Sequence, residues 1–396
     1  MKILFWTDGF WPRVGGVETQ SLAFIREMQE RGHEYKVIAQ QDHPSWNEEE
    51  MVQGVQIRRF DFNSIIKSRN LNIISSIIKF IEFTLQNFKP DIIHLNTTVG
   101  GSLFTFLLCR SRFHIPVILT AYTPCFCLGH FSALVEKAMH SVDHICCISD
   151  WVLQEIQQRR PLLKNKLRRI YCGLSTPKIV ATLPPFSPPT LLILGRLSWE
   201  KGFDTMIRAF ALLQQSGSKA RLIVAGGGVE KPALEKLAHD LHVNGSIEFT
   251  GVLNQADLLT MYAQATLVIV PSIHESFGLV ILEAMQVGRP VIASRVEGIP
   301  EVVAEGETGL LVPIKEPKAL SAAIQILLNN PEKAIEMGLK GRQRALQFTL
   351  DQNATQYEQL YKELMGRRSY TTIGQELEIS AAPKYPRIFR SQPALY

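Results

Sequence analysis

The sequence predicts an α/β protein made of two doubly wound domains, each with a parallel sheet and helices on both of its faces. Short apolar runs alternate with helix-like segments along almost the whole 396-residue chain, which is typical of parallel sheets with crossover helices. The alternation is interrupted at residues 184–189, where four prolines in six positions exclude both a helix and a central strand. A chain of this length can bury two separate cores, so this proline-rich segment is predicted to link two domains.

The apolar runs mark the expected strands in each half of the chain. In the first half they are Ile3–Trp6, Lys36–Ala39, Asp91–Leu95, Val117–Thr120 and Ile145–Ile148, and in the second half Leu191–Leu194, Arg221–Ala225, Ile247–Thr250, Leu267–Val270 and Val291–Ala293. Helical patterns separate them, such as Val17–Arg31, which Gly32 ends. We therefore expect a first domain over residues 1–180, a second over 181–347, a helix over 348–365 that packs back toward the first domain, and a tail over 366–396.

The composition is that of an ordinary globular protein. Hydrophobic residues make up 46% and charged residues 20% of the chain, and no apolar run reaches the length that crosses a bilayer. The apolar start meets Asp8 at once, so it is predicted to be a strand and not a secretory signal. Without such a signal, the six cysteines are expected to be reduced thiols of a cytoplasmic protein. All of them lie in the first half: Cys109, Cys125, Cys127, Cys146, Cys147 and Cys172.

Two features leave contact with a membrane or an acidic partner open. The densest basic cluster lies within residues 159–169; it is most simply a solvated helix end and loop, but it could also attract anionic lipid or an acidic acceptor. Asn63–Phe88 is an apolar segment with scattered cations, which is expected to pack against the first sheet or, alternatively, to lie peripherally on the inner face of a membrane. Nucleic acid is not indicated, because no aromatic platform accompanies the charge.

Two glutamates eight residues apart, Glu275 and Glu283, form the most informative motif. Glu275 is predicted in a strand-to-helix turn, and Glu283 about two turns into the following helix, Leu279–Val287. The free backbone N–H groups at the start of this helix are a natural seat for a phosphate and belong to Phe277, Gly278 and Leu279. A carboxylate beside an anion site suits a ligand that carries both phosphate and hydroxyl groups, as a nucleotide sugar does.

Further candidate ligand groups lie at turns that follow predicted strands. Gly15 and Gly16 precede a helix, so their backbone can approach a ligand closely, although a simple tight turn explains such a pair equally well. Arg196 and Lys201 follow the first strand of the second domain and could neutralise a diphosphate; the alternative is a pair of exposed surface cations. Gly226–Gly228 repeats the order of strand, glycine loop and helix, but it is not the G-x-G-x-x-G pattern of nicotinamide dinucleotide sites.

The order of these motifs resembles that of the retaining glycosyltransferases of GT-B fold, glycosyltransferase family 4 (glycosyl transferases group 1). The stretches that carry the resemblance are Gly195–Asp204, Gly226–Gly228, Glu275–Glu283, Glu283–Ala293 and Glu297–Glu301. It spans roughly Lys2–Leu364 and is stronger in the second half. The resemblance implies two Rossmann-like domains that face a cleft. It also implies a donor nucleotide sugar held mainly by the second domain and a sugar, polyol or lipid-linked acceptor held mainly by the first.

The resemblance also implies roles for individual residues. Arg196 and Lys201 match the family's diphosphate-binding pair and would stabilise the departing diphosphate electrostatically. Glu275 matches the glutamate near the donor sugar and completes the set of candidate catalytic residues, whereas Glu283 matches the glutamate placed against the ribose hydroxyls. The remaining donor-binding candidates are Gly15, Gly16, Gly228, Phe277, Gly278 and Leu279. The expected donor is UDP- or GDP-linked, and transfer is expected to proceed with retention and without a cofactor or metal ion, since the chain has no Asp-x-Asp pair.

The first domain departs from the family pattern on the acceptor side. Where many members carry a histidine after the strand Val117–Thr120, this chain has Tyr122, which can donate a hydrogen bond but is a poor base at neutral pH. The family's Asn-Gly-Val-Asp is Cys172–Ser175 here. We take Glu18 and Tyr122 as the acceptor-side candidates, with His130 as an alternative to the tyrosine.

Cys125, Cys127 and His130 form only a partial zinc pattern, and ordinary buried thiols are the simpler interpretation.

The leading hypothesis is therefore a glycosyltransferase that is hexosyltransferase-like. A nucleotide-sugar-binding protein of the same fold without transferase activity is the alternative from another class. A phosphorylase or epimerase that uses the same cleft is the third possibility.

Overall fold

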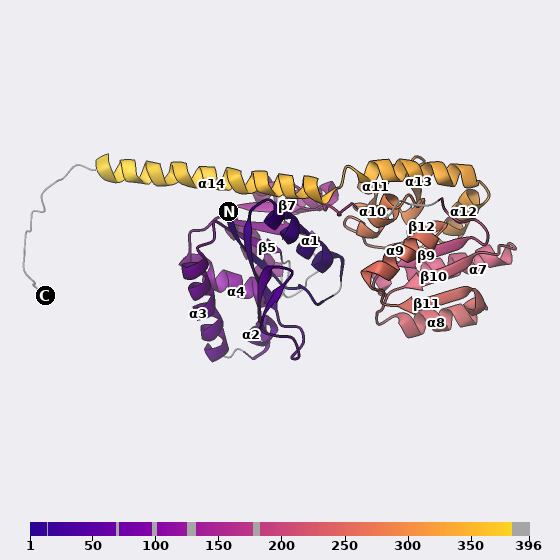
Figure 1. Cartoon of the computed structure of the whole chain (residues 1–396), viewed down its shortest axis with the longest axis horizontal. Coiled ribbons are helices and arrows are strands. Elements are labelled where there is room, and N and C mark those ends of the chain that lie inside the picture. Colours follow the sequence, from indigo (N-terminus) through magenta and orange to yellow (C-terminus); the bar gives the residue numbers. More distant parts are fainter. Residues whose placement is uncertain (14, 69–70, 97–100, 125–131, 177–182, 382–396) are drawn as a thin grey trace, which may run out of the picture.

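The computed structural model of the chain describes residues 1–13, 15–68, 71–96, 101–124, 132–176 and 183–381. They form two α/β units, each built around its own sheet (Figure 1). This arrangement confirms the predicted class of two doubly wound domains with parallel sheets. The boundary predicted near residue 180 falls between the last strand of the first sheet, which ends at Arg169, and the first strand of the second, which begins at Thr190.

The first sheet has the strand order β3-β4-β2-β1-β5-β6-β7-β8. Neighbouring strands are parallel except β3 and β4, which pair antiparallel at one edge. The strands are β1 (Lys2–Thr7), β2 (Glu34–Gln40), β3 (Glu49–Val52), β4 (Val55–Phe60), β5 (Ile92–Asn96), β6 (Val117–Ala121), β7 (His144–Cys147) and β8 (Leu167–Arg169). The α-helices are α1 (Gly16–Glu30), α2 (Phe62–Ser68), α3 (Leu71–Phe88), α4 (Gly101–Cys109), α5 (Ser132–Ser141) and α6 (Asp150–Arg159).

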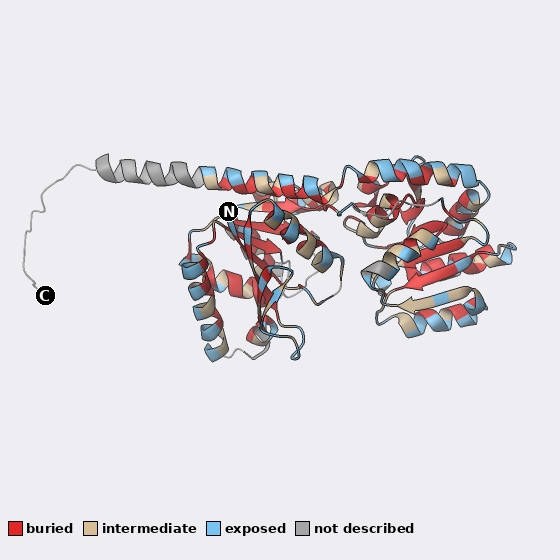
Figure 2. Cartoon of the chain, viewed as in Figure 1, coloured by how far each residue is buried: buried red, intermediate tan, exposed pale blue. Residues whose placement is uncertain are grey.

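The second sheet is parallel throughout and has the order β11-β10-β9-β12-β13-β14. Its strands are β9 (Thr190–Leu194), β10 (Arg221–Ala225), β11 (Ile247–Gly251), β12 (Leu267–Val270), β13 (Val291–Ser294) and β14 (Gly309–Val312). Its α-helices are α7 (Phe203–Gln215), α8 (Lys231–Asp240), α9 (Gln255–Gln264), α10 (Leu279–Gln286), α11 (Ile299–Val302), α12 (Pro317–Leu328) and α13 (Pro331–Ala345). The central strands are apolar on both faces because helices cover both, and Figure 2 shows them as the buried centre of each unit.

The sequence does not predict four of these strands: β3, β4, β8 and β14. Three of them, β3, β8 and β14, are sheet edges of only three or four residues, too short for a clear apolar run. The fourth, β4, carries Arg58 and Arg59 in its centre. Strands at or near an edge need fewer apolar residues than central ones, so a search for apolar runs misses them.

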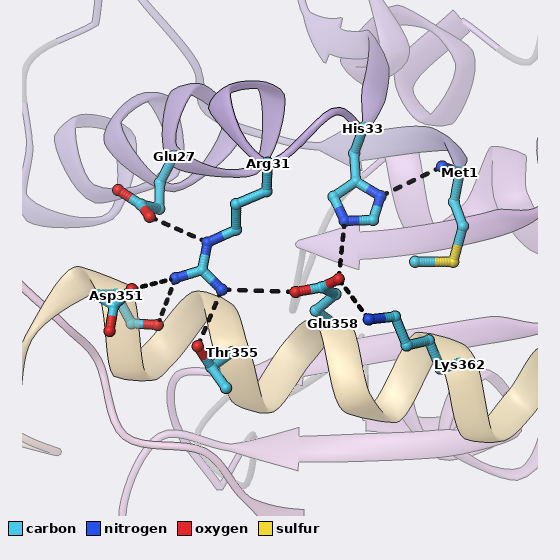
Figure 3. A network of polar contacts seen from close by, with 8 residues as sticks. All are labelled: Met1, Glu27, Arg31, His33, Asp351, Thr355, Glu358 and Lys362. Atoms are coloured by element: carbon cyan, nitrogen blue, oxygen red, sulfur yellow. Dashed lines mark hydrogen bonds and ion pairs between the residues drawn. The ribbon is translucent and has the colours of Figure 1, made fainter.

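The C-terminal helix α14 (Leu350–Ala381) returns from the second domain and lies along the first (Figure 1). Its apolar face joins the core between the first sheet and α1, and that face consists of Leu350, Ala354, Tyr357, Leu360, Tyr361 and Leu364. At the end of α1, Arg31 contacts Asp351, Thr355 and Glu358 of α14 (Figure 3). Charged and apolar contacts thus both hold α14 against α1 and the first sheet.

The helix α14 continues to Ala381, although the sequence analysis expected a tail from residue 366 onward. The extended helix corrects that expectation. A single glycine such as Gly366 costs a helix only about 1 kcal/mol relative to alanine. Proline, the residue type that would end the helix, does not occur between Leu350 and Pro383.

The apolar segment Asn63–Phe88 contains α2 and α3. Helix α3 buries Ile77 and Ile81 in the core of the first domain and exposes Leu71 and Phe83. Within the described residues, no helix is both long enough and apolar enough to cross a membrane.

Candidate active site

A charged pair lies at the carboxyl ends of β9 and β12, the edge at which open parallel sheets bind ligands. Lys201 and Glu275 form an ion pair with 2.8 Å between Nζ and Oε2, and their side chains are 27% and 16% exposed. Together with Gly195 and Ser272 they line a pocket between the ends of the two strands. Two of the three predicted catalytic residues therefore meet in one pocket.

Arg196, the third predicted catalytic residue, is 68% exposed and does not line this pocket. Its guanidinium is 3.5 Å from the carboxylate of Glu200, which also accepts a hydrogen bond of 2.7 Å from Ser198. Partial burial alone would raise the pKa of Glu200, but the bond from Ser198 and the nearby cations lower it below its ordinary value. An ion pair this exposed is worth little, so a stronger anion can replace Glu200 as the partner of Arg196.

The start of α10 faces the first domain. Gly278 caps the helix at φ 100°, a conformation that glycine adopts readily. Phe277 is buried and stacks on Tyr171 of the first domain, with 5.6 Å between the ring centroids. The Cδ1 atom of Leu279 lies 3.1 Å from the position that a Cβ on Gly16 would take. The glycine turn of the first domain and the start of α10 are therefore in contact.

Glu283 lies within α10 and is not among the residues that line the pocket of Glu275. The hydroxyl of Tyr262 donates to its carboxylate at 2.6 Å. Burial raises the pKa of Glu283, and this hydrogen bond opposes the rise. The structure thus gives Glu283 a protein partner, and its contact with ribose hydroxyls stays a prediction.

The glycine turn of the first domain encloses a carboxylate of its own helix. Gly15 caps α1, and a Cβ placed on it would lie 2.3 Å from Oε2 of Glu18. Glu18 is 12% exposed and forms an ion pair of 3.1 Å with Arg13. A negative charge in the first turn also suits the helix dipole. Glu18, an acceptor-side candidate, is therefore anchored within the turn.

Tyr122 is half-buried and belongs to an uncharged hydrogen-bond network in the first domain. Its hydroxyl donates to Oδ1 of Asn96 at 3.0 Å, and the Asn96 amide donates to the Ser21 hydroxyl at 2.9 Å. Burial raises the pKa of Tyr122 far above its ordinary value, so the phenol stays protonated at neutral pH. His94 lines the same small cavity, and burial lowers the pKa of its imidazole to about 3. Both side chains are therefore neutral.

The histidine connects this network to α14. The two nitrogens of His94 lie 2.7 Å from the Tyr361 hydroxyl and 2.7 Å from the Thr120 hydroxyl. Thr120 in turn lies 2.8 Å from the hydroxyl of Tyr357. The C-terminal helix therefore contributes two hydroxyl groups, those of Tyr357 and Tyr361, to the hydrogen-bond network around His94 and Thr120.

Gly228 serves close packing between two turns of the second domain. A Cβ on Gly228 would lie 2.2 Å from the carbonyl oxygen of Leu197. The backbone N–H of Leu197 also donates to Gly227 at 2.9 Å. Any larger residue at position 228 would push away the turn that carries Arg196 and Lys201.

Two glutamates of the Glu297–Glu301 segment, to which the sequence analysis gave no role, make important contacts. Glu297 accepts hydrogen bonds from the backbone N–H of Glu275 and from Nδ1 of His274, both at 2.7 Å. Glu301 accepts from the backbone N–H groups of Asp150 and Trp151 at 2.7 and 2.8 Å, and so caps α6 of the other domain. The only sign of these residues in the sequence was the segment Glu297–Glu301 as one of the stretches that carry the family resemblance. The spacing of the two glutamates does not predict which groups they contact.

Comparison with protein families shows to which family the chain belongs. Residues 14–177 match the model described as Glycosyltransferase Family 4, and residues 178–344 match the model described as Glycosyl transferases group 1. The chain belongs to this glycosyltransferase family.

Curated relatives of this glycosyltransferase match mainly over part of their length. D-inositol 3-phosphate glycosyltransferase of Corynebacterium urealyticum is 35% identical over 187 residues, which cover 46% of this chain and 44% of the relative. The glycogen synthase of Mycobacterium tuberculosis is 33% identical over 277 residues, 66% of each chain. The chain thus aligns with less than half the length of the first of these relatives.

Solved structures share the GT-B fold of this glycosyltransferase over nearly the whole chain. Sucrose-phosphate synthase from Thermosynechococcus elongatus superposes with a TM-score of 0.79 at 23% identity and covers 93% of this chain and 100% of that one. Anabaena HepE in complex with UDP-glucose gives 0.73 at 19% identity, covering 92% and 100%.

The described part of this glycosyltransferase contains no group of three or more His, Cys, Asp or Glu side chains that could hold a metal ion. The partial zinc pattern of Cys125, Cys127 and His130 lies outside the described residues. The basic cluster of residues 159–169 is largely paired within the protein: Arg159 with Glu155, Arg160 with Glu136, Arg168 with Glu363 and Arg169 with Asp150. These ion pairs favour the interpretation of that cluster as ordinary surface charge.

Proposed function

We propose that the protein transfers a glycosyl group from a nucleoside diphosphate sugar, UDP- or GDP-linked, to a sugar, polyol or lipid-linked acceptor. The observation that carries this proposal is the Lys201–Glu275 pair at the carboxyl ends of β9 and β12, in a chain whose two halves both match glycosyltransferase models. Two similar proteins are a D-inositol 3-phosphate glycosyltransferase and the alpha-D-kanosaminyltransferase of Streptomyces kanamyceticus, and one structural neighbour holds UDP-glucose.

The donor diphosphate is assigned to the space between the pocket and the start of α10. Free backbone N–H groups at a helix start attract anions, and the cation Lys201 lies in the adjoining pocket. Arg196 would leave its exposed pair with Glu200 and reach the phosphates with its planar guanidinium. As the bond between the anomeric carbon and the phosphate oxygen breaks, both cations stabilise the negative charge that develops on the leaving diphosphate.

The leaving phosphate is proposed to accept the proton of the acceptor hydroxyl. Glycosyl transfer is proposed to retain the configuration of the anomeric carbon. The acceptor hydroxyl oxygen forms the new bond to that carbon, and its proton passes to the departing phosphate. Tyr122 would take no proton, because its raised pKa keeps it protonated. A resident metal ion is not required by this scheme, since Lys201 and Arg196 supply the positive charge.

Calorimetric titration of UDP, GDP, ADP and their sugars tests the donor site first. We expect one nucleotide to bind the wild type and to bind Lys201→Ala at least tenfold more weakly. The matched control is Lys236→Ala, which removes an exposed lysine of α8 that pairs with Asp240 and does not line the pocket of Lys201 and Glu275. No binding by any of the nucleotides would refute the donor site.

A second candidate function is nucleotide-sugar binding without transfer, which Tyr122 at the usual histidine position favours. Release of free nucleotide from the bound donor, measured with and without a panel of sugar, polyol and lipid-linked acceptors, separates the two functions. Acceptor-dependent release supports the transferase. Saturable binding without release with any acceptor supports the binding protein.

A further inference from the structure

The backbone at Glu297 adopts a conformation that suits glycine better than glutamate. Its φ is 48°, in the left-handed region where the side chain of an L-residue crowds the backbone. Other non-glycine residues of the described chain in this region include His242 and Lys315, both with φ 58°. Such strain persists where the surrounding structure determines it, and it is frequent at functional sites.

The side chain of Glu297 is held by two short hydrogen bonds next to the candidate catalytic pair. It is 14% exposed and accepts from the backbone N–H of Glu275 and from Nδ1 of His274, both at 2.7 Å. Each of its two carboxylate oxygens accepts one of these bonds, Oε1 from His274 and Oε2 from Glu275.

The next residue fixes the same loop from the backbone side. The N–H of Gly298 donates to the carbonyl of Glu275 at 3.1 Å, and a Cβ on Gly298 would lie 2.0 Å from the carbonyl oxygen of Ser276. Glu275 therefore has its N–H and its C=O held by two consecutive residues, 297 and 298. Its side chain is the remaining part of the residue, and that side chain meets Lys201 at 2.8 Å.

The geometry points to Glu297 as a positioning residue, which holds the loop His274–Ser276 so that the Glu275 carboxylate stays in the pocket beside Lys201. This assignment rests on the proposed transferase function and adds a residue to it. Glu297 touches no substrate in this role and acts through Glu275. Its strained backbone is retained because the carboxylate, not the backbone, performs the task.

The variant Glu297→Gly distinguishes the effect of the backbone strain from the effect of the carboxylate. Glycine relieves the strain at φ 48° and removes the carboxylate, so we expect an unchanged or higher Tm together with a kcat lowered about 10- to 100-fold and a KM changed less than threefold. The matched control is His242→Gly, which relieves similar strain in an exposed loop; its kcat is expected to stay at the wild-type value. Glu297→Gln keeps one acceptor oxygen and is expected to retain more kcat than Glu297→Gly.

Hydrogen exchange gives a readout that does not require turnover. The amide of Glu275 is expected to exchange at least tenfold faster in Glu297→Gly than in the wild type, measured on a peptide that spans residues 273–278 of the unliganded protein. Wild-type exchange in this variant, or wild-type kcat, would overturn the positioning role, as would a lower Tm with unchanged kcat. Faster exchange in a protein whose wild type transfers no sugar would support the hold on the loop and refute the proposed function.

Discussion

The two domains present opposite chemistry to the region between them. The second domain offers a charged and accessible pair, Lys201 with Glu275, and an exposed Arg196 beside it. The first offers a buried and neutral network, in which Tyr122 and His94 both have pKa values shifted toward the uncharged form. Under the proposed function, this difference predicts that the second domain stabilises the charge of the leaving diphosphate and that the Tyr122 network of the first domain contributes hydrogen bonds.

Removal of the cation in the second domain is the strongest test of this division. Lys201→Ala is expected to lower kcat/KM at least 100-fold, because a lost charge opposite a leaving diphosphate costs about 3 kcal/mol in transition-state stabilisation. The same substitution at Lys236, exposed in α8, is the control and is expected to leave kcat/KM unchanged. Steady-state kinetics with the donor identified by calorimetry measures both. A loss under fivefold for Lys201→Ala would end the assignment of charge stabilisation to this residue.

Acid is expected to destabilise the neutral network of the first domain. Burial lowers the pKa of His94 from 6.5 to about 3, so the unfolded chain binds the proton more readily than the folded one. The contribution of His94 to stability is therefore full above pH 6.5 and decreases as the pH falls, by about 2 kcal/mol between pH 7 and pH 5. The pKa of His33 is lowered too, which acts in the same direction.

Urea unfolding at pH 7 and pH 5 measures this loss in the wild type and in His94→Gln. The glutamine variant is expected to lose about 2 kcal/mol less than the wild type over that interval, whatever its stability at pH 7. An exposed histidine provides the control, since His239→Gln should keep the wild-type pH dependence. Equal pH dependence in all three proteins would show that His94 is not held neutral.

The contact between the domains at Glu301 is expected to have a moderate effect. Glu301→Ala removes the carboxylate that accepts from the N–H groups of Asp150 and Trp151 at the start of α6, and should lower the unfolding free energy by about 1 kcal/mol, the usual net value of a hydrogen bond. Glu332→Ala, in the exposed first turn of α13, is the control and should cost less. Thermal unfolding of both variants compares them, and equal losses would mean that the cap adds nothing beyond an ordinary surface charge.

The smallest effect is expected at Tyr122. Because its phenol is neutral and donates a hydrogen bond to Asn96, Tyr122→Phe should lower kcat less than tenfold and leave the pH profile of kcat unchanged. A 100-fold loss, or a shifted pH profile, would place proton transfer in the first domain and contradict the division between the two.

The sequence predicted the class of fold and placed Lys201 and Glu275 each after a strand of the second domain, and the contact between them that the structure shows follows from the same rule. Buried parallel strands appear as apolar runs, and the carboxyl ends of such strands lie at one edge of the sheet. Residues 74 positions apart can therefore be placed together once each is assigned to the end of a strand.

Contacts that depend on side-chain direction could not be predicted in this way. The bond between His94 and Tyr361 joins residues 267 positions apart, and each is a polar group inside an otherwise apolar pattern. The exposure of Arg196 likewise depends on its side-chain rotamer. The hydrogen bond between Glu297 and Glu275 depends on the positive φ of Glu297, and the sequence predicts neither feature.

The path of α14 has a consequence for how the protein is made. The core of the first domain includes Tyr357, Leu360 and Tyr361, and the hydroxyl groups of the two tyrosines contact Thr120 and His94. A ribosome synthesises these residues only after the entire second domain. The domain that emerges first is thus completed last, and until α14 has been synthesised, the apolar residues that it covers lack that cover and His94 and Thr120 lack their tyrosine partners.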